Sequence, residues 1–163
     1  PVLIAFIWFV ILNDLRELKI SYKFVGCLAI ITLIFQLKYY NEFVYTDQLR
    51  YQLDINLAHD IMCEIEKIEN YENKPVCFNG VYNFKNQNTL AQVSGCESFW
   101  AFGTGDTLRI LNFLNLSGYT VQYPSEEQKQ TARQQSLNLP TWPNEGSVYD
   151  AGDYVIVNFE NIE

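Results

Sequence analysis

Two tryptophans, Trp100 and Trp142, are the residues of this sequence whose chemistry best suits a binding site. The flat apolar face of an indole ring packs against the apolar face of a sugar ring, and the gain comes from the same burial of area that stabilises a protein core. Further aromatic residues stand nearby in the chain: Phe99, Phe102, Tyr119 and Tyr123. Core packing is the commoner role for any one of them. We therefore treat Trp100 and Trp142 as the candidate sugar-binding residues.

The other motifs predict neither a catalytic site nor a metal site. His59 is the only histidine, and its neighbour Asp60 points in a different direction on a helix, so the two form no dyad. The glycine-containing turn at residues 103–106 lacks the spacing of a phosphate-binding loop. No metal-binding spacing of cysteine and histidine occurs. We expect no catalytic residue, metal or cofactor in this segment.

The four cysteines divide between an apolar and a polar part of the chain. Cys27 lies in an uncharged run, whereas Cys63, Cys77 and Cys96 lie in the later part of the chain, from residue 41 onward. If the polar part is exported, one disulfide is expected, because disulfides persist in oxidising compartments. Two pairings are open, Cys77 with Cys96 or Cys77 with Cys63, and three unpaired buried thiols are the alternative.

The elements that position these residues begin with two uncharged runs, 2–12 and 24–37, on either side of the polar stretch 13–23. A helix from residue 24 to residue 40 would be about 25 Å long, which nearly spans a hydrocarbon layer of about 30 Å. Lysine and tyrosine end this helix, as is common at a lipid headgroup interface. We expect residues 1–40 to form two transmembrane helices, the first of them truncated, joined by a short hairpin. Core helices of a soluble domain are the alternative.

The charge distribution predicts where the rest of the chain lies. Arg16, Lys19 and Lys23 are in the hairpin, and positive residues favour the cytoplasmic side of a membrane. Residues 41–163 would then form one extracytoplasmic domain, with seventeen acidic and seven basic residues and so a net charge of -10. Such a surface is repelled by nucleic acids and by anionic lipid headgroups. The expected partners are therefore the bilayer around the helices and a neutral molecule at the domain, with no nucleic acid.

This domain is predicted to be α/β, with a short sheet flanked by helices. An apolar stripe predicts an amphipathic helix over 46–68 that is capped by Thr46, and the apolar segment 75–82 predicts a buried strand. The stretch 83–96 is expected to be an irregular loop, where binding residues are common. The stripe consists of Leu49, Leu53, Leu57, Ile61, Ile65 and Ile68.

The last third of the chain alternates helix and strand signals. A helix that ends at Gly118 is expected, followed by a strand over 119–124. Ser125 and Gln128 match a capping box at the start of a further helix, and residues 150–153 are expected to turn a β-hairpin. The residues expected to be buried on the first of these helices are Leu108, Ile110, Leu111 and Leu114.

Together these pieces resemble the C-terminal end of bacterial O-antigen-type glucosyltransferases of the GtrII family. The resemblance covers essentially the whole chain: two closing apolar helices, the helix sequence YTDQLRYQLDINLAHDIMCEIEKIE, the strand KPVCFNGV and the later segment GYTV. Its most distinctive part is the terminal sequence LPTWPNEGSVYDAGDYVIVNF. These are structural patterns and not catalytic signatures.

The resemblance implies a polytopic enzyme of the bacterial inner membrane that transfers glucose from a polyprenyl-phosphate carrier to a surface polysaccharide such as the O-antigen of lipopolysaccharide. Its acidic catalytic base would lie upstream of this segment, in an early extracytoplasmic loop, so no catalytic residue is carried over. The segment itself would cap the membrane core and hold the glycan acceptor, with the loop 83–96, Trp100 and Trp142 as contacts. The competing classes are a membrane-anchored, noncatalytic interaction module and a wholly soluble α/β domain.

Overall fold

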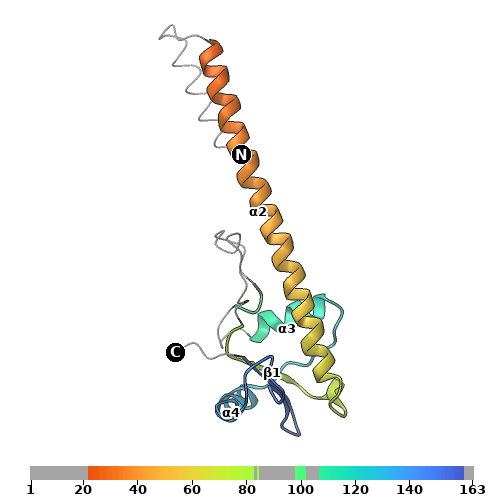
Figure 1. Ribbon diagram of the computed structural model, residues 1–163. Helices are drawn as coiled ribbons and strands as arrows, with labels where there is room; N and C mark the ends of the chain where they lie inside the picture. The colour runs from red at the N-terminus through yellow and green to blue at the C-terminus, as the bar shows by residue number, and fades with distance from the viewer. Residues whose placement is uncertain (1–21, 83, 85–97, 102–106, 160–163) are drawn as a thin grey trace. The chain divides into compact units, whose positions relative to one another are not determined.

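The computed structural model describes residues 22–82, 84, 98–101 and 107–159 (Figure 1). The chain divides into two compact units, Pro1–Val44 and Tyr45–Glu163, and helix α2 (Tyr22–Ile65) contributes residues to both. The other elements, all in the second unit, are η1 (Tyr71–Asn73), β1 (Val76–Asn79), α3 (Thr107–Leu116), α4 (Glu126–Ser136), β2 (Val148–Asp150) and β3 (Val155–Asn158).

The described part of the first unit is the apolar half of α2. Most of its large apolar side chains are exposed, among them Phe24, Ile30 and Phe35, whereas Val25 is 4% exposed. Among the described residues, one helix is long and apolar enough to cross a membrane: it runs over Lys23–Ile65, and its most apolar 18-residue window has a mean hydropathy of 1.4 and is 6% buried. The other apolar run, 2–12, lies outside the described residues, so the first of the two expected membrane helices stays a prediction.

Helix α2 continues through the position where a separate amphipathic helix is expected to begin. Thr46, the expected cap, lies inside α2 and is 1% exposed. Residues 41–45 include neither glycine nor proline, so nothing in this stretch stops a helix that has already formed. The prediction of a helix start at Thr46 is therefore wrong.

In the second unit, the last turns of α2 bury the end of the predicted stripe. Leu57, Ile61 and Ile65 are buried, as expected, whereas Leu53 is 37% exposed. The buried face is widened by residues that the stripe did not include, Ala58 and Met62. This widening follows from the helical period, because residues three and four positions apart share one face.

The sheet is small and mixed, which confirms an α/β unit. Its strand order is β1-β3-β2, with β1 parallel to β3 and β2 antiparallel to β3. Val76 pairs with Val155, and Val148 pairs with Val157. Strand β1 falls within the predicted segment 75–82, and all four of its residues are buried. The expected hairpin is also confirmed, since β2 and β3 are joined by a turn in which Gly152 N–H donates to Asp150 Oδ1 at 2.9 Å.

Helices cover both faces of this sheet, with α3 and α4 on opposite sides of β1 (Figure 1). Strand residues alternate between the two faces, so Val155 and Val157 pack with α2 and α3, whereas Ile156 packs with Ala132 of α4. Helix α4 starts as predicted: Ser125 Oγ accepts from Gln128 N–H at 3.2 Å, and Gln128 Oε1 accepts from Ser125 N–H at 2.8 Å. The capping box is therefore confirmed.

Two predictions between β1 and α4 differ from the structure. On α3, Ile110, Leu111 and Leu114 are buried, but Leu108 is 58% exposed and Phe113 is buried in its place. Residues 119–124 form no strand; their ladder contact is one isolated bridge between Pro75 and Gln122. Pro124 has no N–H with which to extend that bridge.

Candidate functional site

A pocket of about 360 Å³ opens beside Trp142 in the second unit, and we call it the Trp142 pocket. It lies between the end of α2 and the turn that leads into β2. Its lining residues are Glu64, Lys67, Trp142, Pro143, Asn144, Glu145, Gly146, Ser147 and Val148. One aromatic ring and several polar side chains therefore face the same small volume, which lies in the range of small-molecule sites.

Backbone hydrogen bonds to β3 fix the turn that carries Trp142. Trp142 N–H donates to Asn158 O at 2.8 Å, and Asn158 N–H donates to Ser147 O at 2.9 Å. The Asn158 side-chain amide donates to the carbonyl oxygens of three residues just before the turn, at 3.1 to 3.2 Å: Ser136, Leu139 and Pro140. Because a buried strand holds both ends of the turn, the indole is positioned before any ligand arrives.

Inside the turn, Asn144 and Gly146 set the path of the chain. The Asn144 side-chain amide and backbone N–H both donate to Thr141 O, at 2.7 and 3.0 Å. Gly146 has φ +85°, and a Cβ there would stand 3.3 Å from Pro140 Cγ. A residue with a side chain would therefore be strained at position 146 and would crowd Pro140. The sequence PTWPNEGS thus encodes a specific turn.

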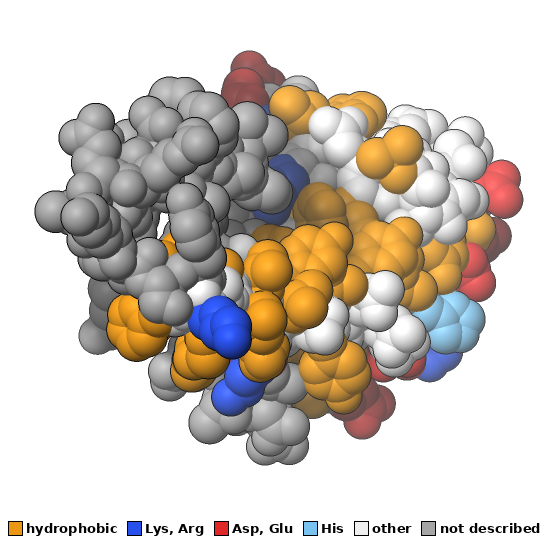
Figure 2. Space-filling view, turned by 90° about the horizontal axis from the view of Figure 1, so that it is seen from above, with side chains coloured by type: hydrophobic (Ala, Val, Ile, Leu, Met, Phe, Trp, Pro, Cys, Tyr) orange, Lys and Arg blue, Asp and Glu red, His pale blue; other side chains and the backbone are white. Residues whose placement is uncertain are grey.

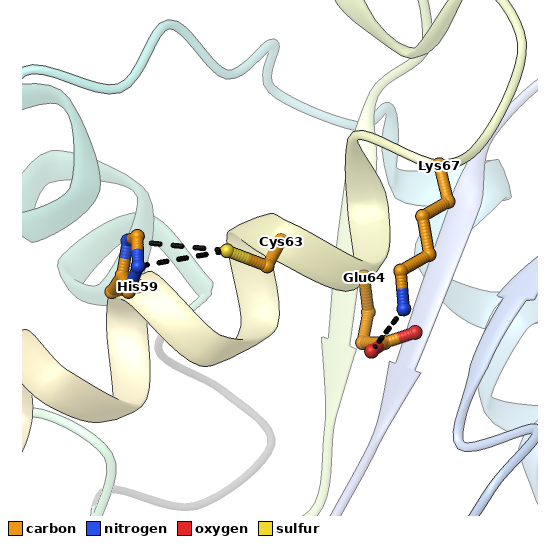
Figure 3. Close-up of polar contacts among 4 residues, drawn as sticks. All are labelled: His59, Cys63, Glu64 and Lys67. Carbon is orange, nitrogen blue, oxygen red and sulfur yellow. Dashed lines mark hydrogen bonds and ion pairs between the residues drawn. The ribbon is translucent and has the colours of Figure 1, made fainter.

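The opposite wall comes from the last turn of α2 and the residues just after it. Glu64 and Lys67 form an ion pair there, with the lysine ammonium directed at the carboxylate (Figure 3). Both side chains are largely exposed, so the pair contributes little to stability. Its effect on the pocket is electrostatic: the lysine charge is balanced, and Glu145 adds a negative charge on the turn side. The pocket is therefore rich in hydrogen-bonding groups and suits a neutral or cationic ligand better than an anionic one.

The two tryptophans that the sequence predicts as sugar contacts differ in their exposure to solvent. Trp100 is 0% exposed, with its ring edge-to-face against Phe78, Phe113 and Phe159. Its indole N–H donates to Asp54 O at 3.2 Å. Neither face of that ring is available to a ligand, so the structure favours the core-packing alternative for Trp100. Trp142 keeps part of its ring at the surface, and its binding role stays a prediction.

The expected loop contacts, and one of the two candidate pairings for the expected disulfide, involve residues outside the part of the chain that the structure describes. Residues 83 and 85–97 lie outside the described residues, and so does Cys96. Cys63 and Cys77 both have free thiols, Cys63 exposed and Cys77 buried, so the Cys63–Cys77 pairing is wrong. Burial raises the pKa of the Cys77 thiol to about 11, which makes it unreactive near neutral pH.

A second hollow, of about 420 Å³, lies between α2 and α3, and we call it the α3 groove. Its lining residues are Tyr51, Phe99, Leu108, Arg109, Asn112, Phe113, Leu116 and Ser117. Phe99 stacks on Phe113 with ring centroids 4.4 Å apart, and the Arg109 guanidinium stands 5.0 Å from the centre of the Phe99 ring. Seen from above the view of Figure 1, hydrophobic side chains gather at the surface of the molecule (Figure 2). Sequence reasoning did not find this groove, because its walls come from three separate segments.

A buried carboxylate holds the Phe99 wall of the groove to α2. Asp54 is 1% exposed and accepts hydrogen bonds from Ser98 Oγ–H and, at 3.0 Å, from Phe99 N–H. Burial raises the pKa of Asp54, and these hydrogen bonds together with the charges of Arg50 and Arg109 oppose that rise. The carboxylate therefore serves to fix the backbone at Phe99.

A third cluster joins His59, Cys63 and Tyr119. His59 Nδ1 lies 3.2 Å from Tyr119 Oη, and Cys63 Sγ lies 3.7 Å from His59 Nε2 (Figure 3). His59 and Cys63 are four positions apart in the sequence, a spacing that places both on one face of a helix. Among the described residues, no group of three or more His, Cys, Asp or Glu could hold a metal. One thiol and one imidazole are fewer ligands than a structural or catalytic zinc site uses.

No family model, curated protein or solved structure matches the chain. The fold and the site therefore define a coarse class: an α/β unit with a mixed three-stranded sheet in its described part, a polar tryptophan pocket, and an apolar helix in the same chain.

Proposed function

We propose that the second unit binds a neutral glycan in the Trp142 pocket and that α2 anchors it to a membrane. The observation that carries this proposal is the combination of a partly exposed indole with carboxylate and amide side chains around one small volume. A pyranose ring can stack its apolar face on Trp142 while vicinal hydroxyls donate to Glu64 or Glu145 and accept from Asn144. A neutral hexose fits the charge of this pocket.

We further propose that the chain is the C-terminal part of a polytopic membrane glucosyltransferase of the GtrII type. In that role the glucose donor is a polyprenyl-phosphate-linked sugar, and the acceptor is a surface polysaccharide. The catalytic base belongs to an upstream extracytoplasmic loop, and the Trp142 pocket positions the acceptor. The supports are the apolar character of α2, the resemblance of the sequence pieces and the pocket itself. Bacterial inner-membrane localisation, with the second unit outside the cytoplasm, follows from the same proposal.

Glycan binding can be tested on the full chain in detergent micelles. Calorimetric titration with a panel of neutral hexose trisaccharides should detect binding, and Trp142→Ala should weaken it about tenfold, which corresponds to about 1.4 kcal/mol. Trp142→Phe should retain part of the affinity because a smaller ring still stacks. Tyr149→Ala is the matched control, since Tyr149 is an exposed aromatic residue on β2 that does not line the pocket. Equal glycan affinity of the wild type and a folded Trp142→Ala variant would contradict the assignment of the Trp142 pocket as the glycan site.

The enzyme is distinguished from the noncatalytic anchored module by the reading frame that precedes residue 1. Further apolar segments and an early acidic external loop would support the transferase. A start codon close to residue 1 would support the module. In the full-length enzyme, Trp142→Ala should raise KM for the acceptor more than it lowers kcat, because the pocket is proposed to bind and not to react.

A further inference from the structure

We propose that the α3 groove binds a zwitterionic phospholipid, with an acyl chain along its aromatic wall and the lipid phosphate at Arg109. This inference rests on the proposed membrane anchoring by α2. The groove and the Trp142 pocket share no lining residue, so the lipid site is independent of glycan binding.

The apolar character of the groove points to an acyl chain. Large hydrophobic side chains on its rim stand in solvent, with Leu116 89% exposed, Leu108 58% exposed and Tyr51 55% exposed. Its floor is the stacked pair of Phe99 and Phe113. Removing this surface from water is favourable in proportion to the apolar area covered, and an alkyl chain covers it without needing hydrogen-bond partners.

The charges in and around the groove select the headgroup. Among the described residues that line the groove, Arg109 is the charged one, and a guanidinium binds phosphate oxygens in a bidentate manner. The chain from residue 41 onward has a net charge of -10, which disfavours a lipid with a net negative charge. A phosphatidylethanolamine headgroup satisfies both conditions, because its phosphate can face Arg109 while its ammonium group keeps the lipid neutral.

The chain itself indicates why the occupant is a lipid and not a soluble ligand. Exposed apolar side chains cover the first-unit half of α2, and 6% of its most apolar 18-residue window is buried. In a bilayer, that segment would keep the second unit covalently attached to the membrane. Lipid would then be an abundant apolar partner for the protein, and tyrosine and arginine, which line the groove, are residue types common at headgroup level.

The test uses the full chain in nanodiscs of mixed phosphatidylethanolamine and phosphatidylglycerol, with benzoylphenylalanine in place of Leu116 or, as the control, of Leu137. Leu137 is 73% exposed at the end of α4, which packs on the other face of the sheet. After illumination, mass spectrometry should find about tenfold more lipid adduct at position 116 than at position 137, mainly with phosphatidylethanolamine. Arg109→Gln should lower that adduct roughly tenfold, whereas Arg133→Gln on α4 should leave it unchanged.

The outcomes separate the lipid site from the anchoring on which it rests. Alkaline extraction of the same sample reports whether the chain is held in the membrane. Retention in the membrane with equal adducts at the two positions, or with a second copy of the chain as the adduct at position 116, overturns the lipid site and leaves the anchoring intact. Release on extraction with a strong lipid adduct at position 116 overturns the anchoring alone. Release without a lipid adduct overturns both.

Discussion

The Trp142 pocket and the α3 groove are hollows of similar size in the same unit, and they are built in opposite ways. The pocket has a wall of consecutive residues, a turn held by backbone hydrogen bonds to β3, with Trp142 among polar side chains. The groove is formed by side chains from α2, α3 and the segment 98–101, which stack on one another through aromatic rings. Hydrogen-bonded turns fix polar groups for directional contacts, whereas packed rings offer apolar area without direction.

The largest difference in stability between these two regions is expected when Trp100 and Trp142 are each replaced by alanine. Trp100 lies beneath the groove with no exposed surface, so Trp100→Ala should lower the free energy of unfolding by about 3–5 kcal/mol. Trp142→Ala should lower the free energy of unfolding by only about 1 kcal/mol, because Trp142 is only partly buried. Pulse proteolysis of the full chain in urea and detergent micelles measures both values. A comparable loss for the two variants would contradict the assignment of Trp142 as an available ring.

A smaller effect on stability is expected when the ion pair of Asp150, on strand β2, is removed. Lys74 Nζ donates to Asp150 Oδ1 and Oδ2 at 2.9 and 2.8 Å, and this hydrogen-bonded cation lowers the pKa of Asp150. Asp150 is substantially exposed, so Asp150→Asn should lower the free energy of unfolding by only about 0.5 kcal/mol at neutral pH.

The pH dependence of this difference has a definite sign. Because the pKa of Asp150 is lower in the folded chain, the ion pair contributes fully above the unfolded pKa of about 4 and its contribution is lost as the pH falls through the folded value. Unfolding of the wild type and Asp150→Asn at a series of pH values should show the gap closing below about pH 4. A gap that stays constant as the pH falls well below that value would show that the carboxylate charge is not its source.

The smallest stability effect is expected at the rim of the groove. Leu116 is 89% exposed, so Leu116→Ser should change the free energy of unfolding by less than about 0.5 kcal/mol. Its neighbour in the helix, Leu114, is 0% exposed, and Leu114→Ser is the contrasting variant, with a cost of about 2 kcal/mol or more. A large loss in Leu116→Ser would mean that the rim is part of the core and not a free surface.

Much of the local structure could be predicted from the sequence. The capping box at Ser125, strand β1, the hairpin between β2 and β3 and part of the buried faces of α2 and α3 depend on residues that are neighbours in the chain. The failures have local causes too: α2 has no glycine or proline that would end it before Thr46, and Pro124 removes a donor that a strand over 119–124 would need.

The candidate site was predicted only in part, because accessibility is a property of distant contacts. Nothing near Trp100 in the sequence distinguishes its ring from that of Trp142. Phe78 belongs to β1 and Phe159 directly follows β3, and they enclose Trp100 only once the sheet has formed. Glu64 and Lys67 reach the Trp142 pocket for the same reason, since the end of α2 meets the turn after more than seventy intervening residues.

The elements with short-range causes could be predicted from neighbouring residues: an apolar helix, a capped helix, a strand of buried residues and a β-hairpin. Which indole faces solvent and where the α3 groove lies depend on how distant segments pack. The physical reason is that secondary structure responds to hydrogen bonds and periodicity within a few residues, whereas a pocket exists only where side chains from separate segments leave space unfilled.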